Sequence, residues 1–272
     1  MQITEFENIT LKTEHYHAVI SLKNKPVNAL SESFIENFLK VLNHIESLTE
    51  IGVVILRSEL GVFSAGGDAT WMANEIQNNG VDGLLKEFER IMNRFRILCH
   101  RIHTARYLTI AEIKGHALAG GLELAAACDL RVAADNQEIR IGVPEMTHFG
   151  VAPSGGGGVY YLVRLLGVAN AMQLVINGNS VHPRRALEMG LVQELLAVDE
   201  FEVNNEKRYS EIAKRGGALA IQEIKKMLYK AEPFSDINQH LEADRNSHWH
   251  VMRHGNFKAN VSKFAEKFGS RN

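Results

Sequence analysis

Glycine placement constrains this chain more than any other feature of its sequence. Its 272 residues include 22 glycines but only 5 prolines. Three glycine groups stand out, at residues 63–68 (FSAGGD), 115–123 (GHALAGGLE) and 153–158 (PSGGGG). The first two follow apolar, β-branched segments that we predict to be buried strands, and the third opens a segment of helical pattern. Each group therefore marks a junction leading into a helix.

The order of elements predicts an α/β domain. Strands are expected at 18–22, 53–56, 108–113 and 130–133, with helices at 34–48 and 121–128. Ser33 and Glu36 suit a capping box at the first helix. The strand–helix–strand order favours parallel pairing. The polar stretch 69–83 is typical of a mobile loop. From residue 159 to 268 the pattern is mostly helical.

Composition excludes several classes of function. The net charge of −2 and pI near 6.6 give no basic surface for nucleic acid or an anionic membrane. We expect no signal peptide, because the N-terminus shows no basic segment followed by an apolar one. We also expect no membrane span, because no long apolar run is evident. Cys99 and Cys128 cannot build a disulfide framework, which favours the cytoplasm or an organelle matrix over secretion, and we expect the cytoplasm. No carboxylate or cysteine completes a ligand set with His248, His250 and His254, so no metal site is expected.

Glycine groups at such junctions suit ligand binding. The carboxyl ends of parallel strands share one edge, where ligands bind, and glycine lets backbone N–H groups approach them closely. Two N–H donors from separate loops would form an oxyanion hole for an acyl oxygen. A phosphate cradle is the alternative, but neither GxxxxGK[ST] nor GxGxxG after the first strand is present. A tight turn is a sufficient explanation for any one glycine group taken alone. Three groups at corresponding positions, however, favour a ligand-binding site.

Two glutamates accompany these loops. Glu123 falls in the first turn of a small apolar helix that we predict to be buried, and Glu145 follows Pro144 at the end of a strand-like run. In a partly dry pocket, two carboxyl groups take different pKa values and can share acid and base work. The alternatives are a helix N-terminal charge at Glu123 and a solvated loop acid at Glu145.

Several segments resemble the enoyl-CoA hydratase/isomerase (crotonase) family. They are PVNAL (26–30), FSAGGD (63–68), GHALAGGLELAAACDLRVAAD (115–135), and GVPE followed by the glycine run (142–158). The resemblance covers roughly residues 10–195. It implies an α/β fold, a spiral of repeated ββα units forming two roughly perpendicular sheets. It also implies a catalytic core over 1–195 and a helical region over 196–272 that builds a homotrimer or a dimer of trimers.

The resemblance assigns roles residue by residue. Gly67 and Gly120 would hold the thioester oxygen through their N–H groups, while Glu123 and Glu145 would hold the reacting water. Coenzyme A would enter as part of the substrate, with no prosthetic group. The implied substrate-binding residues are Lys25, Asn28, Ala29, Leu30, Ala65 and Asp68, with Trp71, Met72 and His148 as candidates for the acyl pocket.

The implied reaction is hydration of a 2-enoyl-CoA to a 3-hydroxyacyl-CoA. The same oxyanion hole serves isomerases, CoA hydrolases and C–C bond enzymes of the family, so these stay open. A non-catalytic paralogue binding acyl-CoA or RNA is a further alternative. The basic helix face formed by Lys225, Lys226 and Lys230 would be the surface that contacts RNA. We interpret it instead as a solvated helix face. Glu112 departs from the family, which has a small apolar residue there, and its partner cannot be predicted.

Overall fold

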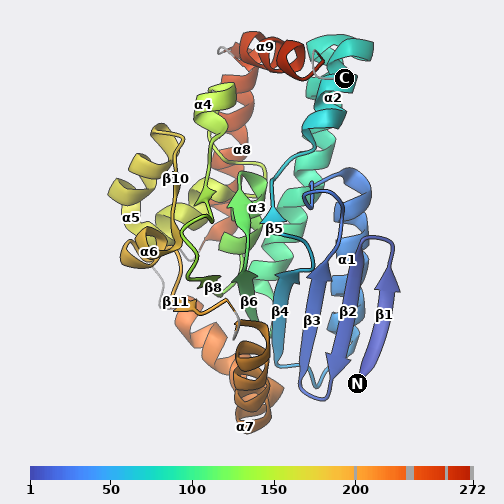
Figure 1. The fold of residues 1–272 in the computed structure, drawn as a ribbon, viewed down its shortest axis with the longest axis vertical. Coiled ribbons are helices and arrows are strands. Elements are labelled where there is room, and N and C mark those ends of the chain that lie inside the picture. The colour runs from blue at the N-terminus through green and yellow to red at the C-terminus, as the bar shows by residue number, and fades with distance from the viewer. Residues whose placement is uncertain (199–200, 231–235, 255–256, 270–272) are drawn as a thin grey trace.

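A seven-stranded sheet forms the base of the fold (Figure 1). The computed structural model describes residues 1–198, 201–230, 236–254 and 257–269. The strands, in spatial order, are β1 (Gln2–Phe6), β2 (Ile9–Glu14), β3 (His17–Leu22), β4 (Val53–Ser58), β6 (Leu108–Ile113), β8 (Leu130–Ala134) and β11 (Glu194–Leu196). The first three pair antiparallel, and every later neighbour pairs parallel.

A second, smaller sheet carries the loops of interest. Its strands, in spatial order, are β10 (Ser180–Val181), β9 (Ile141–Gly142), β7 (His116–Leu118) and β5 (Val62–Ser64). A strand of the large sheet, a strand of the small sheet and a helix follow one another three times: β4–β5–α2, β6–β7–α3 and β8–β9–α4. These helices are α2 (Ala69–Thr104), α3 (Gly120–Ala126) and α4 (Glu145–Phe149). The expected α/β spiral of ββα units is therefore confirmed.

Helix α1 (Glu32–Ser47) lies where the apolar spacing predicted it. Its buried face includes Phe34 and Phe38, both fully enclosed. The N-cap, however, is Ser31 and not Ser33: the Ser31 hydroxyl accepts the Phe34 N–H at 3.3 Å. The predicted capping box was wrong because the preceding loop ends two residues earlier than the pattern suggested.

The stretch 69–83 is not a loop. It forms the first part of α2, which continues to Thr104 and changes direction at Gly80 (φ 69°, ψ 179°). Asp68 caps the helix, its carboxylate accepting the Trp71 N–H at 2.9 Å. Apolar contacts stabilise this polar segment, because Met72 and Leu84 are buried in a cluster with residues of the C-terminal helices.

The C-terminal third is mostly helical, as expected, although β10 and β11 interrupt it. Its helices are α5 (Gly158–Ile176), α6 (Pro183–Glu188), α7 (Phe201–Lys230), α8 (Ile237–His254) and α9 (Phe257–Gly269). Helix α9 lies across the upper end of α2 and also contacts α4 and α8 (Figure 1). The last helices therefore cover the edge of the fold at which α4 begins.

Helix α5 is long and apolar enough to be considered a membrane span by length and composition, with a mean hydropathy of 1.5. The sequence analysis expected no such segment. Gly167 (φ 70°, ψ 166°) breaks the helix into two parts, each far shorter than the roughly 20 residues that a span needs. In the first part, Tyr160, Tyr161 and Leu162 are buried in the core.

A buried ionic network fixes α7 to the large sheet. The Glu112 side chain on β6 has no exposed surface, and its Oε2 lies 2.8 Å from the Arg57 Nε on β4. Its Oε1 accepts a hydrogen bond from the Asn205 side chain at 2.6 Å. Arg57 also contacts Glu206 on α7 at 3.1 Å. The partners of Glu112, which the sequence left unassigned, are thus a cation on the next strand and an amide on α7.

Candidate active site

Helix α3 begins at a crowded and strained point. The preceding Ala119 has φ 53° and ψ −130°, a conformation that costs a non-glycine residue free energy. A Cβ on Gly121 would lie 2.4 Å from the Ser64 carbonyl oxygen, and a Cβ on Gly120 would lie 2.7 Å from the Leu30 side chain. The Ser64 backbone cannot give way easily, so the close packing explains the glycine at position 121, whereas at position 120 the Leu30 side chain would have to move.

The first two glycine loops lie against each other. A Cβ on Gly66 (φ 89°) would lie 2.9 Å from the Gly120 nitrogen, so the loop after β5 packs directly on the start of α3. Gly120 opens α3, and its N–H therefore has no partner within the helix. Gly67 and Gly120 line the same cavity. The two residues to which the sequence analysis assigned the oxyanion hole therefore lie in the wall of one cavity.

The third glycine group holds the Glu123 carboxylate. Glu123 is 4% exposed. Its Oε2 accepts the N–H groups of Gly156 at 2.7 Å and of Gly158 at 2.8 Å. Cβ atoms on Gly155 and Gly158 would lie 3.4 Å and 2.9 Å from its carboxylate oxygens. Two short hydrogen bonds from backbone donors stabilise the ionised carboxylate.

Glu145 has the opposite environment. It is the first residue of α4, and its Oε2 is buried with no hydrogen-bond partner among the described residues. Burial, and secondly the negative charge of Glu123, raise the pKa of Glu145 from its ordinary 4.5 to about 8. The raised pKa favours the protonated form of Glu145 at neutral pH, beside a Glu123 carboxylate that is held by two backbone N–H donors.

These groups face a cavity of about 210 Å³. This is smaller than the roughly 300–1,000 Å³ of pockets that enclose a whole drug-sized ligand, and it suits a short group. Of the sequence-predicted residues, those lining it are Leu30, Ala65, Gly67, Met72, Gly120, Glu123, Glu145 and His148. Further wall residues that sequence reasoning missed are Phe88, Met92, Phe95, Ser154, His248, Phe257 and Phe264. The missed residues come mainly from α2, which was expected to begin as a loop, and from α8 and α9.

The other predicted binding residues lie outside the cavity lining. Lys25 is exposed, and Ala29 is half-buried. Asn28 (φ 50°) points inward: its amide donates to the Ser58 hydroxyl at 2.8 Å and the Phe63 carbonyl at 2.9 Å. Asp68 caps α2, and the half-buried Trp71 packs against the apolar core. The Asn28 side chain thus shapes the loop that leads to Leu30.

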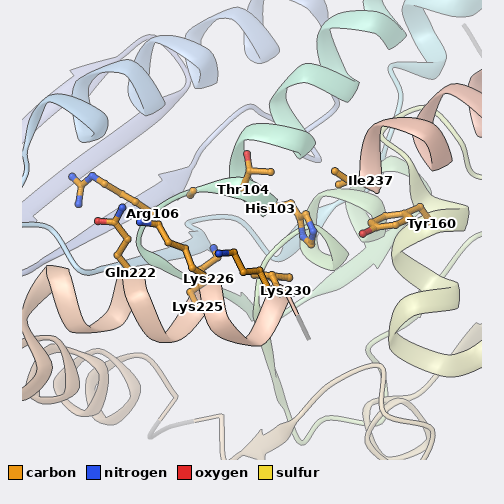
Figure 2. A pocket seen from close by; sticks show the side chains of 11 residues that line it. His103, Thr104, Arg106, Tyr160, Gln222, Lys225, Lys226, Lys230 and Ile237 are labelled. Carbon is orange, nitrogen blue, oxygen red and sulfur yellow. The ribbon is translucent and has the colours of Figure 1, made fainter. Parts of the chain in front are cut away.

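A second cavity, of about 360 Å³, contains neither a carboxylate pair nor a glycine loop. It lies where the ends of α2 and α7 meet the starts of α5 and α8, with His103, Tyr160 and three lysines among its lining residues (Figure 2). Lys225 is only 8% exposed and pairs with Asp129 at 2.8 Å. The predicted solvated basic face was therefore wrong at Lys225.

The structure offers no metal-ligand set within its described part: no group of three or more His, Cys, Asp or Glu side chains is placed to hold an ion there. His248 lines the active-site cavity and is buried, whereas His250 is exposed. The side chain of His254 lies outside the described residues.

Known proteins resemble this chain in sequence and in fold. The sequence profile of the enoyl-CoA hydratase/isomerase family matches residues 13–271. A probable enoyl-CoA hydratase of Bacillus subtilis (strain 168) is 35% identical over 195 residues, covering 72% of this chain and 71% of that protein. The fatty acid oxidation complex subunit alpha of Aliivibrio fischeri is 34% identical over 175 residues, covering 64% of this chain but 24% of that subunit. The chain thus matches about a quarter of that subunit's length.

Solved structures show the same fold. A crystal structure of an enoyl-CoA hydratase from Geobacillus kaustophilus superposes with a TM-score of 0.75 at 28% identity, covering 98% of this chain and 96% of that one. An enoyl-CoA hydratase from Bacillus halodurans gives a TM-score of 0.81 at 23% identity, covering 94% and 100%. The chain belongs to the enoyl-CoA hydratase/isomerase (crotonase) family.

Proposed function

We propose that this protein hydrates 2-enoyl-CoA thioesters to 3-hydroxyacyl-CoA. The observation that carries the proposal is the contrast between the two glutamates. Glu123 is stabilised as a carboxylate by two N–H groups, and the pKa of Glu145 is raised to about 8. Addition of water to a double bond needs a base for the water and an acid for the α-carbon, and this pair supplies both.

In the proposed mechanism, the N–H groups of Gly67 and Gly120 bind the thioester oxygen and stabilise the negative charge of the enolate. Loss of one such donor costs about 3 kcal/mol of barrier. Glu123 removes a proton from water as it attacks the β-carbon. Glu145 delivers its proton to the α-carbon and is left ionised, and proton exchange with solvent restores both groups.

The CoA moiety is proposed to lie outside the cavity, along residues 25–30 and 65–68. Lys25 is exposed there and would reach a phosphate, while backbone carbonyls of this segment would meet the adenine amino group. Within the cavity, Met72 and His148 would contact the acyl chain. The reaction uses no prosthetic group or metal, and we place it in the cytoplasm.

We further propose a homotrimer, or a dimer of trimers, with residues 1–195 as the catalytic core. Exposed apolar side chains near the end of α7 support an interface: Leu219, Ile224, Met227 and Leu228 are 72%, 51%, 62% and 68% exposed. Contiguous exposed apolar side chains of this size mark interaction surfaces. The helical region 196–272 also reaches the active site, since α8 and α9 contribute to the cavity wall.

The test is to mix the protein with crotonyl-CoA and follow loss of the conjugated enoyl absorbance. Glu123→Gln should lower kcat by about 10²–10⁴-fold, the usual contribution of a positioned general base. CoA binding by calorimetry should be unchanged. Glu138→Gln, at an exposed position, is the matched control and should keep full activity.

The same experiment separates the alternatives. If no enoyl-CoA of any chain length is hydrated while acyl-CoA still binds, the hydratase proposal is wrong. Double-bond migration or CoA release under those conditions would identify an isomerase or a hydrolase. Salt-sensitive RNA retention without any turnover would identify a binding protein.

A further inference from the structure

Ser154 stands at the start of the third glycine group, and the four residues after it are glycines. The glycines have little room for a side chain. A Cβ on Gly156 would lie 2.7 Å from the Phe95 ring, and a Cβ on Gly158 would overlap the Pro153 carbonyl oxygen. Ser154, by contrast, lines the active-site cavity. Its hydroxyl is therefore the one side-chain polar group that residues 154–158 bring to the cavity wall.

The Ser154 hydroxyl has no partner in the protein. The residue is only 2% exposed, yet its Oγ takes part in no hydrogen bond within the part of the chain that the structure describes. It is also absent from the polar atoms that the described protein encloses completely, so a water-sized molecule can reach it. Buried polar groups are nearly always paired, with water or a ligand where no protein group serves. The hydroxyl therefore awaits a partner from the cavity.

Two hydrogen bonds hold Ser154 in a fixed position beside Glu123. The Ser154 carbonyl oxygen accepts a hydrogen bond from the Arg96 Nη2 on α2 at 3.0 Å. Two residues further on, the Gly156 N–H donates to the Glu123 Oε2 at 2.7 Å. A Cβ on the intervening Gly155 would lie 3.4 Å from the other carboxylate oxygen, Oε1. The backbone that carries the hydroxyl thus runs along the carboxylate of the proposed base, and groups held in this way can orient a small reactant.

The hydrogen-bonding capacities of these two groups suit a water molecule. An ionised carboxylate only accepts hydrogen bonds, whereas a hydroxyl donates one and accepts others. A water molecule between them can donate one proton to Glu123 and form its second hydrogen bond with Ser154. One lone pair of the water is then left to attack a carbon atom. The apolar wall residues Met92 and Phe95 offer no competing partner.

We propose that the Ser154 hydroxyl binds the reacting water and, after addition, the 3-hydroxyl group formed from it. This inference rests on the proposed function, because the water is that of the hydration reaction. The serine orients the water and exchanges no proton. The water oxygen bonds to the β-carbon, its proton passes to Glu123, and the proton of Glu145 passes to the α-carbon.

The kinetic test is Ser154→Ala, which removes the hydroxyl and keeps the Cβ. With crotonyl-CoA, kcat should fall about tenfold, in line with loss of one neutral hydrogen bond. KM should stay as in wild type, because the water and not the acyl-CoA loses a contact. The urea midpoint should not fall, because the hydroxyl has no protein partner to lose. Ser180→Ala, at an exposed position on β10, is the matched control and should behave as wild type.

A binding test follows the same contact without turnover. Calorimetry compares 3-hydroxybutyryl-CoA with butyryl-CoA, and Glu145→Gln serves as the background so that the hydroxy compound is not dehydrated during the measurement. Adding Ser154→Ala should weaken binding of the better-bound enantiomer of 3-hydroxybutyryl-CoA about tenfold and binding of butyryl-CoA far less. A site that pairs a ligand hydroxyl discriminates against the analogue without it, and this discrimination should shrink.

The outcomes separate this inference from the proposed reaction. If Ser154→Ala removes the preference for the hydroxy compound although wild type hydrates no enoyl-CoA, the proposed reaction fails and the Ser154 contact stands. If wild type hydrates crotonyl-CoA and Ser154→Ala leaves both kcat and the preference unchanged, the reaction stands and the inference is overturned. Equal weakening of both compounds would also overturn it, because the serine would then act only on the shape of the cavity.

Discussion

Replacing Glu145 with glutamine should stabilise the protein while abolishing hydration. In the folded chain, burial and then the charge of Glu123 raise the pKa of Glu145 from 4.5 to about 8. Between these two values the folded protein holds a proton that the unfolded chain has released. The free energy of unfolding of the wild type should therefore fall as pH rises through this window. Glutamine has no such proton, so this dependence should disappear in the variant.

The magnitude follows from the width of the window. One bound proton changes stability by about 1.4 kcal/mol per pH unit, so the cost at pH 7 is about 3 kcal/mol. The Glu145 residue is only half-buried by surface area, and screening by solvent reduces this to about 2 kcal/mol. Glu145→Gln should thus exceed wild type in stability by about 2 kcal/mol at pH 7. Near pH 4.5, where the folded protein and half of the unfolded chains are protonated, the two should be nearly equal.

Urea unfolding measures this directly, at one fixed protein concentration because any oligomer makes stability depend on it. Titrations at pH 5, 6, 7 and 8 should give a stability difference that widens with pH. Glu138→Gln, at an exposed position, should show no such widening. A difference between Glu145→Gln and wild type that stays constant from pH 5 to pH 8 would refute the protonated state assigned to Glu145. Turnover of crotonyl-CoA should fall about 10²–10⁴-fold in the same variant.

Three further substitutions test other parts of the structure. Gly158→Ala would place a Cβ 2.9 Å from the Glu123 Oε2, so kcat for hydration should fall at least about 10²-fold. Arg57→Met leaves the fully buried carboxylate of Glu112 without its cation, and urea titration should show a loss of about 3–5 kcal/mol. Leu228→Glu replaces an exposed apolar side chain of α7 with a charged one, and sedimentation should show dissociation of the proposed trimer into monomers.

Each of these substitutions has a matched control. Gly61→Ala adds a Cβ that meets no atom within 4 Å, so it should leave kcat unchanged. Arg94→Met removes a more exposed ion pair with Glu36 and should cost no more than about 1 kcal/mol. Leu187→Glu changes an apolar residue that is 40% exposed on α6 and should leave the sedimentation coefficient as in wild type. Equal effects of a variant and its control would contradict the role assigned to the variant.

The strands and glycine junctions could be predicted because neighbouring residues decide them. The runs 53–56 and 108–113 are apolar and rich in β-branched residues, and a glycine loop follows each of them within a few residues. The structure places these runs in β4 and β6. Close approach of the backbone at Ser64 is visible in the sequence as Gly121, because a Cβ there would lie 2.4 Å from the Ser64 carbonyl oxygen.

The far wall of the cavity could not be predicted in the same way. The first turns of α2 are polar, and what stabilises them is burial of Met72 and Leu84 against Trp249, Met252 and Phe257 of the last helices. These partners are more than 150 residues away in the chain. The spacing of apolar residues within one segment therefore cannot reveal them. For His248, a lone histidine in an amphipathic helix gives no sign of whether it faces water or a cavity.

The two glutamates of the cavity differ for a reason that also lies in contacts distant along the chain. Each of them is an acidic residue in the first turn of its helix. Helix position alone would therefore favour the ionised form of each. What separates them is the glycine run at 153–158, whose N–H groups reach Glu123 across more than 30 residues of sequence. Once these donors are committed to Glu123, its negative charge adds to burial in raising the pKa of Glu145. The same glycines that hold the proposed base therefore help to keep the proton on the proposed acid, and a substitution that loosens the run should weaken both proposed roles together.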